Sequence, residues 1–180
     1  LQHADWTFPV PITYGPGRID ELPMHCHRLG LNNPLMITDS GTASLTFVSG
    51  ALDLLARAGI ASTIFHNISQ NPTENDVCNA HSVFRSGNHD GVIAIGGGSG
   101  MDAGKATALL AGSRHDLWQH DFEKVPPKLD PADKFPPLIC IPTTSGTGAE
   151  TESTAMITNI DRGMKLCVWH PLLKPQLVIL

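Results

Sequence analysis

Three consecutive glycines and a serine, Gly96 to Ser99, follow the apolar run Gly91–Ile95 and precede a segment with helical periodicity, Gly100–Ala111. Glycine lets the backbone approach a ligand closely. The free N–H groups at a helix start, together with the positive end of the helix dipole, suit a phosphate group. The pattern therefore predicts a pyrophosphate site at this strand-to-helix turn, and a tight turn without a ligand is the alternative.

Known glycine motifs fit this cluster unequally. A P-loop would need glycine at position 99 and Ser or Thr at position 106, where the chain has Ser99 and Ala106. A nucleophile elbow would need glycine at position 101, where Met101 stands. The dinucleotide pattern GxGxxA does fit, as Gly98-Ser99-Gly100 through Ala103. The acidic residue about 20 positions later would be Asp121, in a predicted loop, which weakens that fingerprint.

Two charged residues follow in the first turns of the predicted helix. Asp102 is a candidate for ligand contact, because it lies beside the glycine cluster. Its other interpretation is a first-turn carboxylate that complements the helix dipole, with Lys105 as its partner at i+3.

A second cluster starts where the apolar run Leu138–Ile141 meets Pro142 and continues as Thr143-Thr144-Ser145-Gly146-Thr147-Gly148. Hydroxyl groups and open backbone amides can bind phosphate, ribose or carboxamide groups. A capped loop is the alternative, since the same residues dominate ordinary turns. We do not expect Ser145 to act as a nucleophile, because no histidine with an acidic partner is evident nearby.

These clusters need a scaffold of strands and helices to position them. Apolar residues in consecutive positions are typical of strands buried on both faces, as in a parallel sheet. The predicted strands are Leu35–Thr38, Ser62–Phe65, Gly91–Ile95, Leu138–Ile141, Lys165–Val168 and Gln176–Leu180. The predicted helices are Ile19–Leu29, Ser44–Ala58, Thr73–Ser86 and Gly100–Ala111.

The alternation of strands and helices predicts βαβ units with helices on both faces of the sheet. Thr73 and Asp76 form an approximate capping box at one helix start. The proline-rich segment Glu123–Pro137 is expected to be an exposed loop. Both clusters follow strands, and ligands of open α/β sheets bind at the carboxyl ends of strands.

Length, composition and net charge limit the classes of protein to which the chain can belong. A chain of 180 residues with 41% hydrophobic residues suits one ordinary domain. A net charge of −5 offers no basic surface for nucleic acid or an anionic membrane. No apolar stretch approaches the roughly 18 residues needed to span a membrane. Four cysteines without a C-x-x-C pair favour a reducing compartment, so we expect a cytoplasmic protein.

Together the two clusters resemble the motifs of a known protein family. GGGSxxDxxK at Gly96–Lys105 and PTTxGTGxE at Pro142–Glu150 resemble the motifs of the iron-containing, group III alcohol dehydrogenase family. The resemblance covers essentially the whole chain. It extends to further segments at Trp6–Pro23, Met36–Gly41, Asn71–Thr73 and Ile157–Pro171.

The resemblance implies a Rossmann-like α/β domain over residues 1–180, a parallel sheet flanked by helices. The family's all-helical, metal-binding domain is expected beyond Leu180. Members interconvert alcohols with aldehydes or ketones by hydride transfer to or from a nicotinamide cofactor, assisted by a divalent ion, often iron or zinc. A homodimer or larger homo-oligomer is implied, because the opening strand in relatives pairs across subunits.

The resemblance also assigns residues. Gly97, Gly98 and Ser99 are expected to hold the pyrophosphate, and Thr143, Thr144 and Thr147 to line the cofactor from the other side. Asn71 and Lys165 match positions that contact the cofactor in relatives, although Lys165 could be an ordinary strand-end lysine. Asp39 follows the second strand of the resemblance, where a carboxylate would bind ribose hydroxyls and repel a 2′-phosphate. We therefore expect NAD rather than NADP, with a turn residue as the other interpretation of Asp39.

No metal ligand or catalytic residue is assigned within the chain. The resemblance implies Fe²⁺ or Zn²⁺ in a full-length protein, held by residues beyond Leu180. None of the nine histidines matches a ligand position. His25-Cys26-His27 is expected to be structural, and His115-Asp116 and His120-Asp121 are expected in a solvated loop.

Two alternatives remain open. One is a relative with different chemistry, such as a maleylacetate-reductase-like or glycerol-dehydrogenase-like enzyme. The other is a non-catalytic nucleotide-binding module, if the protein ends at Leu180. We expect the 180 residues alone to have no catalytic turnover.

Overall fold

A computed structural model describes the whole chain except residues 1, 2, 129 and 131. Its centre is a seven-stranded sheet in the order β1-β2-β9-β6-β5-β3-β4, in which every pair is parallel except β1 with β2. The strands are β1 (Ala4–Trp6), β2 (Ile12–Tyr14), β3 (Leu35–Ile37), β4 (Thr63–Phe65), β5 (Val92–Gly96), β6 (Leu138–Pro142) and β9 (Leu177–Ile179). The predicted α/β fold with a mostly parallel sheet is confirmed.

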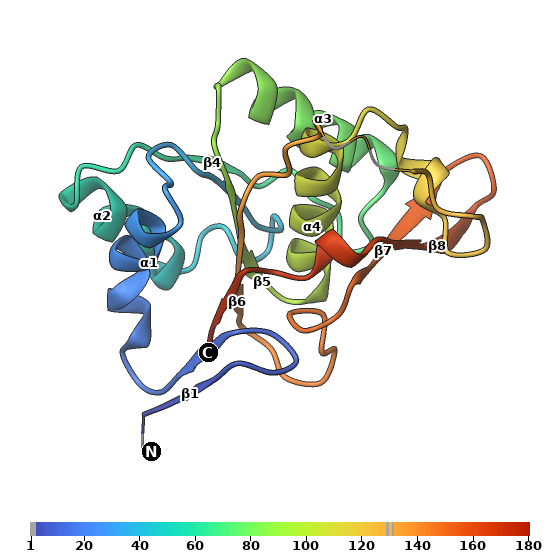
Figure 1. The fold of residues 1–180 in the computed structure, drawn as a ribbon. Helices are drawn as coiled ribbons and strands as arrows, with labels where there is room; N and C mark the ends of the chain where they lie inside the picture. The colour runs from blue at the N-terminus through green and yellow to red at the C-terminus, as the bar shows by residue number, and fades with distance from the viewer. Residues whose placement is uncertain (1–2, 129, 131) are drawn as a thin grey trace.

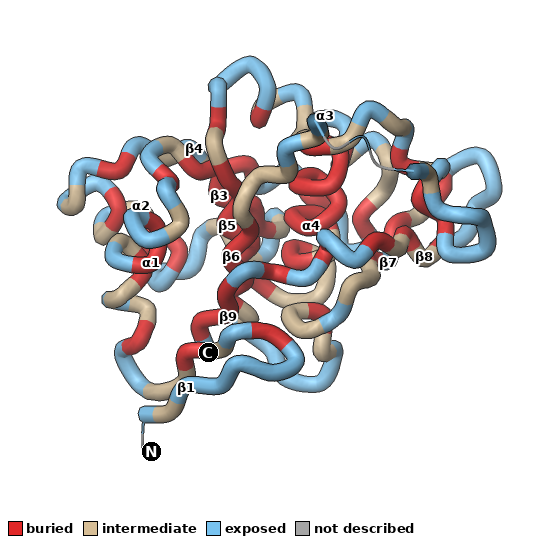
Figure 2. Tube along the Cα trace, in the orientation of Figure 1, coloured by how far each residue is buried: buried red, intermediate tan, exposed pale blue. Residues whose placement is uncertain are grey.

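Helices cover both faces of the sheet, as Figure 1 shows. The α-helices of the described residues are α1 (Leu22–Arg28), α2 (Thr46–Arg57), α3 (Glu74–Ser86) and α4 (Gly98–Gly112). Alternate residues of the central strands point to opposite faces. Ile93 and Ile139 pack with α1 and α2, whereas Ala94 and Cys140 pack with α3 and α4. Burial on both faces explains why these strands are apolar at consecutive positions (Figure 2).

Helix α4 is the most buried helix of the described chain, and small residues let it approach the sheet (Figure 2). A Cβ atom added at Gly104 would lie 2.5 Å from the Cβ of Ala94 on β5. The helix begins at Gly98, two residues before the predicted start, so the glycine cluster itself forms its first turn.

The predicted capping box at the start of α3 is confirmed. The Thr73 hydroxyl accepts a hydrogen bond of 3.2 Å from the backbone N–H of Asp76. The Asp76 carboxylate accepts one of 2.9 Å from the backbone N–H of Thr73. Two N–H groups that a helix leaves unpaired at its start are thereby satisfied.

One strand prediction is wrong in its placement. The segment Lys165–Val168 belongs to β8 (Met164–Trp169), which pairs with β7 (Thr154–Asn159) in a separate two-stranded antiparallel sheet. This hairpin packs one face on α4 through Ala155, Ile157 and Val168. Its residues are therefore buried alternately, unlike those of the main sheet. The strands predicted from the sequence do not include β7.

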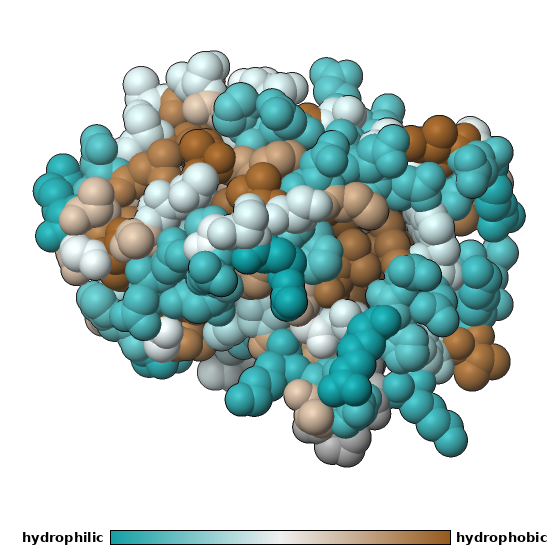
Figure 3. Space-filling view, turned by 90° about the horizontal axis from the view of Figure 1, so that it is seen from above, coloured by the Kyte–Doolittle hydropathy of each residue, from teal (hydrophilic) through white to brown (hydrophobic). Residues whose placement is uncertain are grey.

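The expectation of a solvated loop around His120 is also wrong. A short 3-10 helix, Leu117–His120, packs beside β8, and His120 and Asp121 are buried. The described part of Glu123–Pro137 is irregular and mostly exposed, as expected, while positions 129 and 131 of that prediction lie outside the described residues. Figure 3 views the molecule from above, where hydrophobic residues form separate areas between hydrophilic ones. In the described part of the chain, no helix combines the length and apolarity that crossing a membrane requires.

Candidate functional site

The two motif clusters meet at the carboxyl edge of the sheet, in the lower part of Figure 1. Strands β5 and β6 end level with each other, because Gly96 pairs with Pro142. The backbone N–H of Thr143 donates a 2.9 Å hydrogen bond to the carbonyl oxygen of Gly96. Segments almost 50 residues apart in the sequence therefore form one surface.

The glycines of the first cluster leave little free space around them. A Cβ added at Gly97 would lie 3.3 Å from the Thr144 hydroxyl oxygen, and one added at Gly98 would lie 3.2 Å from the Thr147 methyl group. Gly96 has a φ of +141°, which L side chains rarely adopt. The structure thus brings Gly97, Gly98, Thr144 and Thr147 together, as the two-cluster interpretation requires.

The first turn of α4 offers backbone donors. Gly97 is its N-cap, and the described residues provide no side-chain cap for the amides that follow. The Ser99 hydroxyl donates its hydrogen bond to the carbonyl oxygen of Gln70. The donor that Ser99 can offer to a ligand is therefore its backbone N–H. Uncapped N–H groups at a helix start form a suitable anion site.

Asp39 lies beside this turn, separated from the end of β3 by Thr38. Its carboxylate accepts hydrogen bonds from the backbone N–H groups of Gly41 and Thr42, at 3.0 and 2.9 Å, and from the Thr42 hydroxyl at 2.7 Å. A Cβ added at Gly96 would lie 3.1 Å from the same carboxylate. Asp39 is therefore a turn residue that also faces the glycine cluster. A carboxylate can accept about four hydrogen bonds, and Asp39 accepts three within the protein, so one acceptor site remains for a ligand.

A polar cavity of about 320 Å³ opens on the α4 side of the glycine turn. Its wall includes both predicted and unpredicted residues, among them Ser99, Asp102, Thr147, Glu152, Met156 and Lys165. Asn71 does not line the cavity. It is exposed next to Pro72, which does.

Asp102 is a half-buried carboxylate in the wall of this cavity. Burial raises its pKa to about 6, against the opposing effects of the Lys105 charge and a backbone hydrogen bond from Met156. A carboxylate with a raised pKa in a cavity is a candidate for ligand contact.

Lys105 has a role that the sequence did not predict. Its side chain is fully buried, and its ammonium group donates to the carbonyl oxygens of Ala149, at 2.7 Å, and Thr154. Burial lowers the pKa of this ammonium group. Lys105 therefore fastens α4 to the segment that follows the second cluster, instead of simply pairing with Asp102. The available signal was a lysine within the apolar helix stretch Ala103–Leu110.

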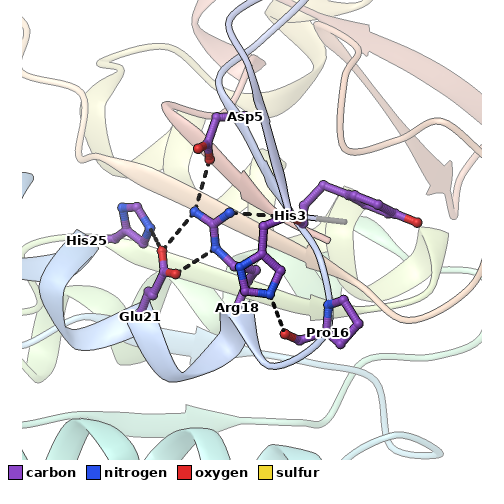
Figure 4. Close-up of polar contacts among 7 residues, drawn as sticks. His3, Asp5, Pro16, Arg18, Glu21 and His25 are labelled. Carbon is purple, nitrogen blue, oxygen red and sulfur yellow. Dashed lines mark hydrogen bonds and ion pairs between the residues drawn. The ribbon is translucent and has the colours of Figure 1, made fainter. Parts of the chain in front are cut away.

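An apolar cavity of about 270 Å³ lies on the α1/α2 side of the same edge. Residues that line it include Arg18, Phe47, Ile95, Ile141, Thr143 and Ile179. The Arg18 guanidinium donates 3.0 Å hydrogen bonds to Asp5 and Glu21, as Figure 4 shows, and one to the carbonyl oxygen of Tyr14. Its charge is therefore matched within the protein, and the cavity remains mainly apolar.

The described residues hold no group of three or more histidine, cysteine, aspartate or glutamate side chains placed to bind a metal ion. His25 lies against Glu21 at 3.4 Å (Figure 4), which supports the structural role expected for it. The site at the carboxyl edge consists of backbone donors, hydroxyls and charged side chains, and it is suited to a phosphate-containing ligand.

Comparison with known proteins gives the family context. A sequence model described as "Iron-containing alcohol dehydrogenase" matches residues 9–180. The 4-hydroxybutyrate dehydrogenase of Cupriavidus necator is 37% identical over 161 residues, which are 88% of this chain and 41% of that protein. The chain spans less than half the length of the curated relatives it matches first.

Solved structures agree with the sequence comparison. A crystal structure of a 1,3-propanediol oxidoreductase superposes with a TM-score of 0.86 at 28% identity, over 99% of this chain and 45% of that one. A sulfoacetaldehyde reductase from Bifidobacterium kashiwanohense, solved in complex with NAD⁺, superposes with a TM-score of 0.80 at 30% identity, with the same coverage. The matched region of each structure corresponds to the fold described above.

Proposed function

The chain belongs to the iron-containing alcohol dehydrogenase family, and we propose that it is the NAD-binding part of an oxidoreductase that interconverts an alcohol and an aldehyde or ketone. The observation that carries this proposal is the contact between the two motif clusters around the start of α4. Glycines that a Cβ would crowd and uncapped helix amides together fit a pyrophosphate. When bound, NAD⁺ supplies the acceptor for a hydride from the alcohol.

The two cavities suggest how the cofactor lies. The apolar cavity between Phe47 and Ile141 suits an adenine ring, and Asp39 would accept a hydrogen bond from the adjacent ribose. With the pyrophosphate at Gly97–Ser99, the nicotinamide riboside would then occupy the polar cavity beside Asp102. Thr147 and Lys165 would contact it there through a hydroxyl and an ammonium group.

NAD is the proposed cofactor rather than NADP. The charge of Asp39 would repel a 2′-phosphate at the ribose position. No cationic side chain takes part in the hydrogen bonds that Asp39 makes among the described residues. The relative solved with NAD⁺ supports the use of a nicotinamide cofactor in this family.

The divalent ion, Fe²⁺ or Zn²⁺, is proposed for the full-length protein only. The described residues offer no ligand set for it. Its ligands would therefore be residues other than the described ones.

The test is an assay of the full-length protein with NAD⁺ and a panel of neutral alcohols, diols and hydroxy acids. We expect NADH formation that a strong chelator abolishes and that Fe²⁺ or Zn²⁺ restores. The 180-residue chain should bind NAD⁺ without turning over. Turnover that is indifferent to the chelator would instead favour a relative with different chemistry, and failure to bind any dinucleotide would contradict the proposal.

We also propose that the protein is a homodimer or larger homo-oligomer. Strand β1 is an edge of the sheet, with β2 as its only strand neighbour in the described chain. Trp6 and Phe8 are exposed beside this edge. An unpaired edge with large apolar side chains is suited to pairing with another chain. Sedimentation velocity of the full-length protein tests this, and a monomer at micromolar concentration would contradict it.

A further inference from the structure

We propose that Glu152 makes the site prefer oxidised over reduced cofactor, by placing a negative charge beside the nicotinamide ring. The inference rests on the proposed function, because it takes the polar cavity as the nicotinamide position. Glu152 was not among the site residues predicted from the sequence.

Glu152 is held in place at the cavity. It lies between the second cluster and β7, and its carboxylate accepts a 2.9 Å hydrogen bond from the Thr154 hydroxyl. A Cβ added at Gly148 would lie 3.8 Å from the other carboxylate oxygen. The segment on either side of Glu152 is in turn fixed by Lys105, which donates to the carbonyl oxygens of Ala149 and Thr154.

Charged groups of both signs surround the cavity. Asp102 contributes a carboxylate from α4, Glu152 contributes one from the loop, and Lys165 contributes an ammonium group from β8. The ammonium group of Lys105 lies behind this wall, with two of its donors directed to carbonyl oxygens. The ammonium groups of Lys165 and the buried Lys105 match the two carboxylates in number when Asp102 is ionised. Loss of the Glu152 carboxylate would therefore leave the cavity surrounded by a net positive charge.

The charge of Glu152 distinguishes the two redox forms of the cofactor. Oxidation of the alcohol carbon transfers a hydride, one proton with two electrons, to the nicotinamide ring, and the hydroxyl proton is released. The ring is cationic before this step and neutral after it, whereas the pyrophosphate charge is the same in both forms. A charge near the ring therefore changes the relative affinity for NAD⁺ and NADH, whereas a charge that faces only the pyrophosphate does not.

The size of the effect follows from distance and screening. Glu152 is exposed to solvent, so an effective dielectric constant between the surface and bulk values applies. If a separation of about 8 Å between the carboxylate and the ring is taken, this corresponds to roughly a fivefold difference in Kd. Added salt should reduce the difference, because an exposed charge is screened.

The test measures binding, independently of activity. Dissociation constants of NAD⁺ and NADH are determined by calorimetry on the full-length protein and on Glu152→Gln. We expect NAD⁺ to bind about fivefold more weakly to the variant and NADH to bind equally well. The charge-reversal variant Glu152→Lys should weaken NAD⁺ further, again with little change for NADH. Glu123→Gln, which removes an exposed carboxylate from a different loop, is the matched control.

The outcomes separate the two proposals. Equal changes for NAD⁺ and NADH, or no change in either, would overturn the role of Glu152 while leaving the proposed function intact. A wild-type protein that binds neither dinucleotide would overturn the proposed function, and the role of Glu152 with it.

Discussion

The ammonium group of Lys105 donates a 2.7 Å hydrogen bond to the carbonyl oxygen of Ala149, 44 residues further along the chain. Lys105 is in the helix that begins at the glycine cluster, and Ala149 directly follows the threonine- and glycine-rich cluster. This single buried contact therefore joins the two halves of the candidate site. Because both partners lie in the interior, the hydrogen bond is shielded from competing water.

Replacement of Lys105 by Met should destabilise the protein strongly. Methionine fills a similar volume but leaves the carbonyl oxygens of Ala149 and Thr154 without their donor. A buried carbonyl without a partner costs about 1–3 kcal/mol, and that of Thr154, which is only partly buried, costs less, so we expect a loss of about 2–4 kcal/mol. Urea unfolding measures this loss. Lys128→Met, at an exposed position, serves as the control. Equal stability of both variants would contradict a stabilising role for the two hydrogen bonds of Lys105.

Replacement of Asp102 by Asn should stabilise the folded protein at neutral pH. Burial raises the pKa of Asp102 to about 6, from an ordinary value of 3.8, so ionisation of this group opposes folding above that range. The shift corresponds to at most about 3 kcal/mol at pH 8. The wild-type protein should gain this stability as the pH falls from about 6 to 4, so the advantage of the variant disappears there.

The same Asp102→Asn variant should bind NAD⁺ less well, because it removes a carboxylate from the polar cavity. Higher stability with lower affinity is typical of a residue retained for binding. Urea unfolding at pH 8 and pH 4, combined with calorimetry, tests both parts. A variant that is less stable at pH 8 would contradict the role of desolvation.

Replacement of Asp39 by Asn should relax the choice of cofactor. The amide oxygen can still accept from the backbone N–H groups of Gly41 and Thr42, so the turn is preserved while the charge is lost. We expect NADPH affinity to rise about tenfold and NADH affinity to change less, since repulsion of the 2′-phosphate is removed. Fluorescence titration of both cofactors measures this, with Asp20→Asn as the control. Tighter binding of NADPH than NADH by the wild-type protein would refute the proposed role.

His120 should make the protein sensitive to acid. The residue is 1% exposed, and its Nδ1 atom has no hydrogen-bond partner among the described residues. Burial, with the nearby rings of His170 and His115, lowers its pKa to about 4. Above pH 6.5 the ring is neutral in both the folded and the unfolded state. Between pH 6.5 and 4 only the unfolded chain gains the proton, so stability falls by roughly 3 kcal/mol.

The comparison variant is His120→Phe, which cannot gain a proton. Urea unfolding at pH 7.5, 6 and 5 should show a smaller decline for this variant than for the wild-type protein. Parallel declines would show that His120 does not set the acid sensitivity. His66→Phe, at an exposed position, controls for the replacement of a histidine by phenylalanine outside the interior.

Local chemistry allowed much of the fold to be predicted. The apolar strands β3, β5 and β6 and the capping box at Thr73 follow from patterns within a few residues of each other. The hairpin partner of β8 could not be found in this way, because the burial of Ala155 and Ile157 depends on α4, which is distant in the sequence. The burial of His120 could not be predicted for the same reason, because it depends on the contact with His170, which is 50 residues away in the sequence.

The residues of the candidate site also fall into those that a local sequence pattern predicts and those that only the structure reveals. The glycines and threonines carried a pattern that the sequence alone reveals, and the structure brings them together as expected. Lys105 and Glu152 had no comparable pattern, since their roles depend on which carbonyl oxygen or cavity lies beside them in space. Asn71 matched only by position, and the structure leaves it outside the polar cavity.

Because β5 and β6 end level with each other, the candidate site depends on the number of residues in each strand and in the turn that follows it. Because Gly96 pairs with Pro142, one residue inserted within β6 would shift the threonines by a full position against the glycines and turn alternate side chains to the opposite face. The exposed segment before β6 can absorb insertions without moving that register, since loops tolerate added length at small cost. Homologous sequences should accordingly vary in length between residues 123 and 137 and keep a fixed length from each strand to its motif.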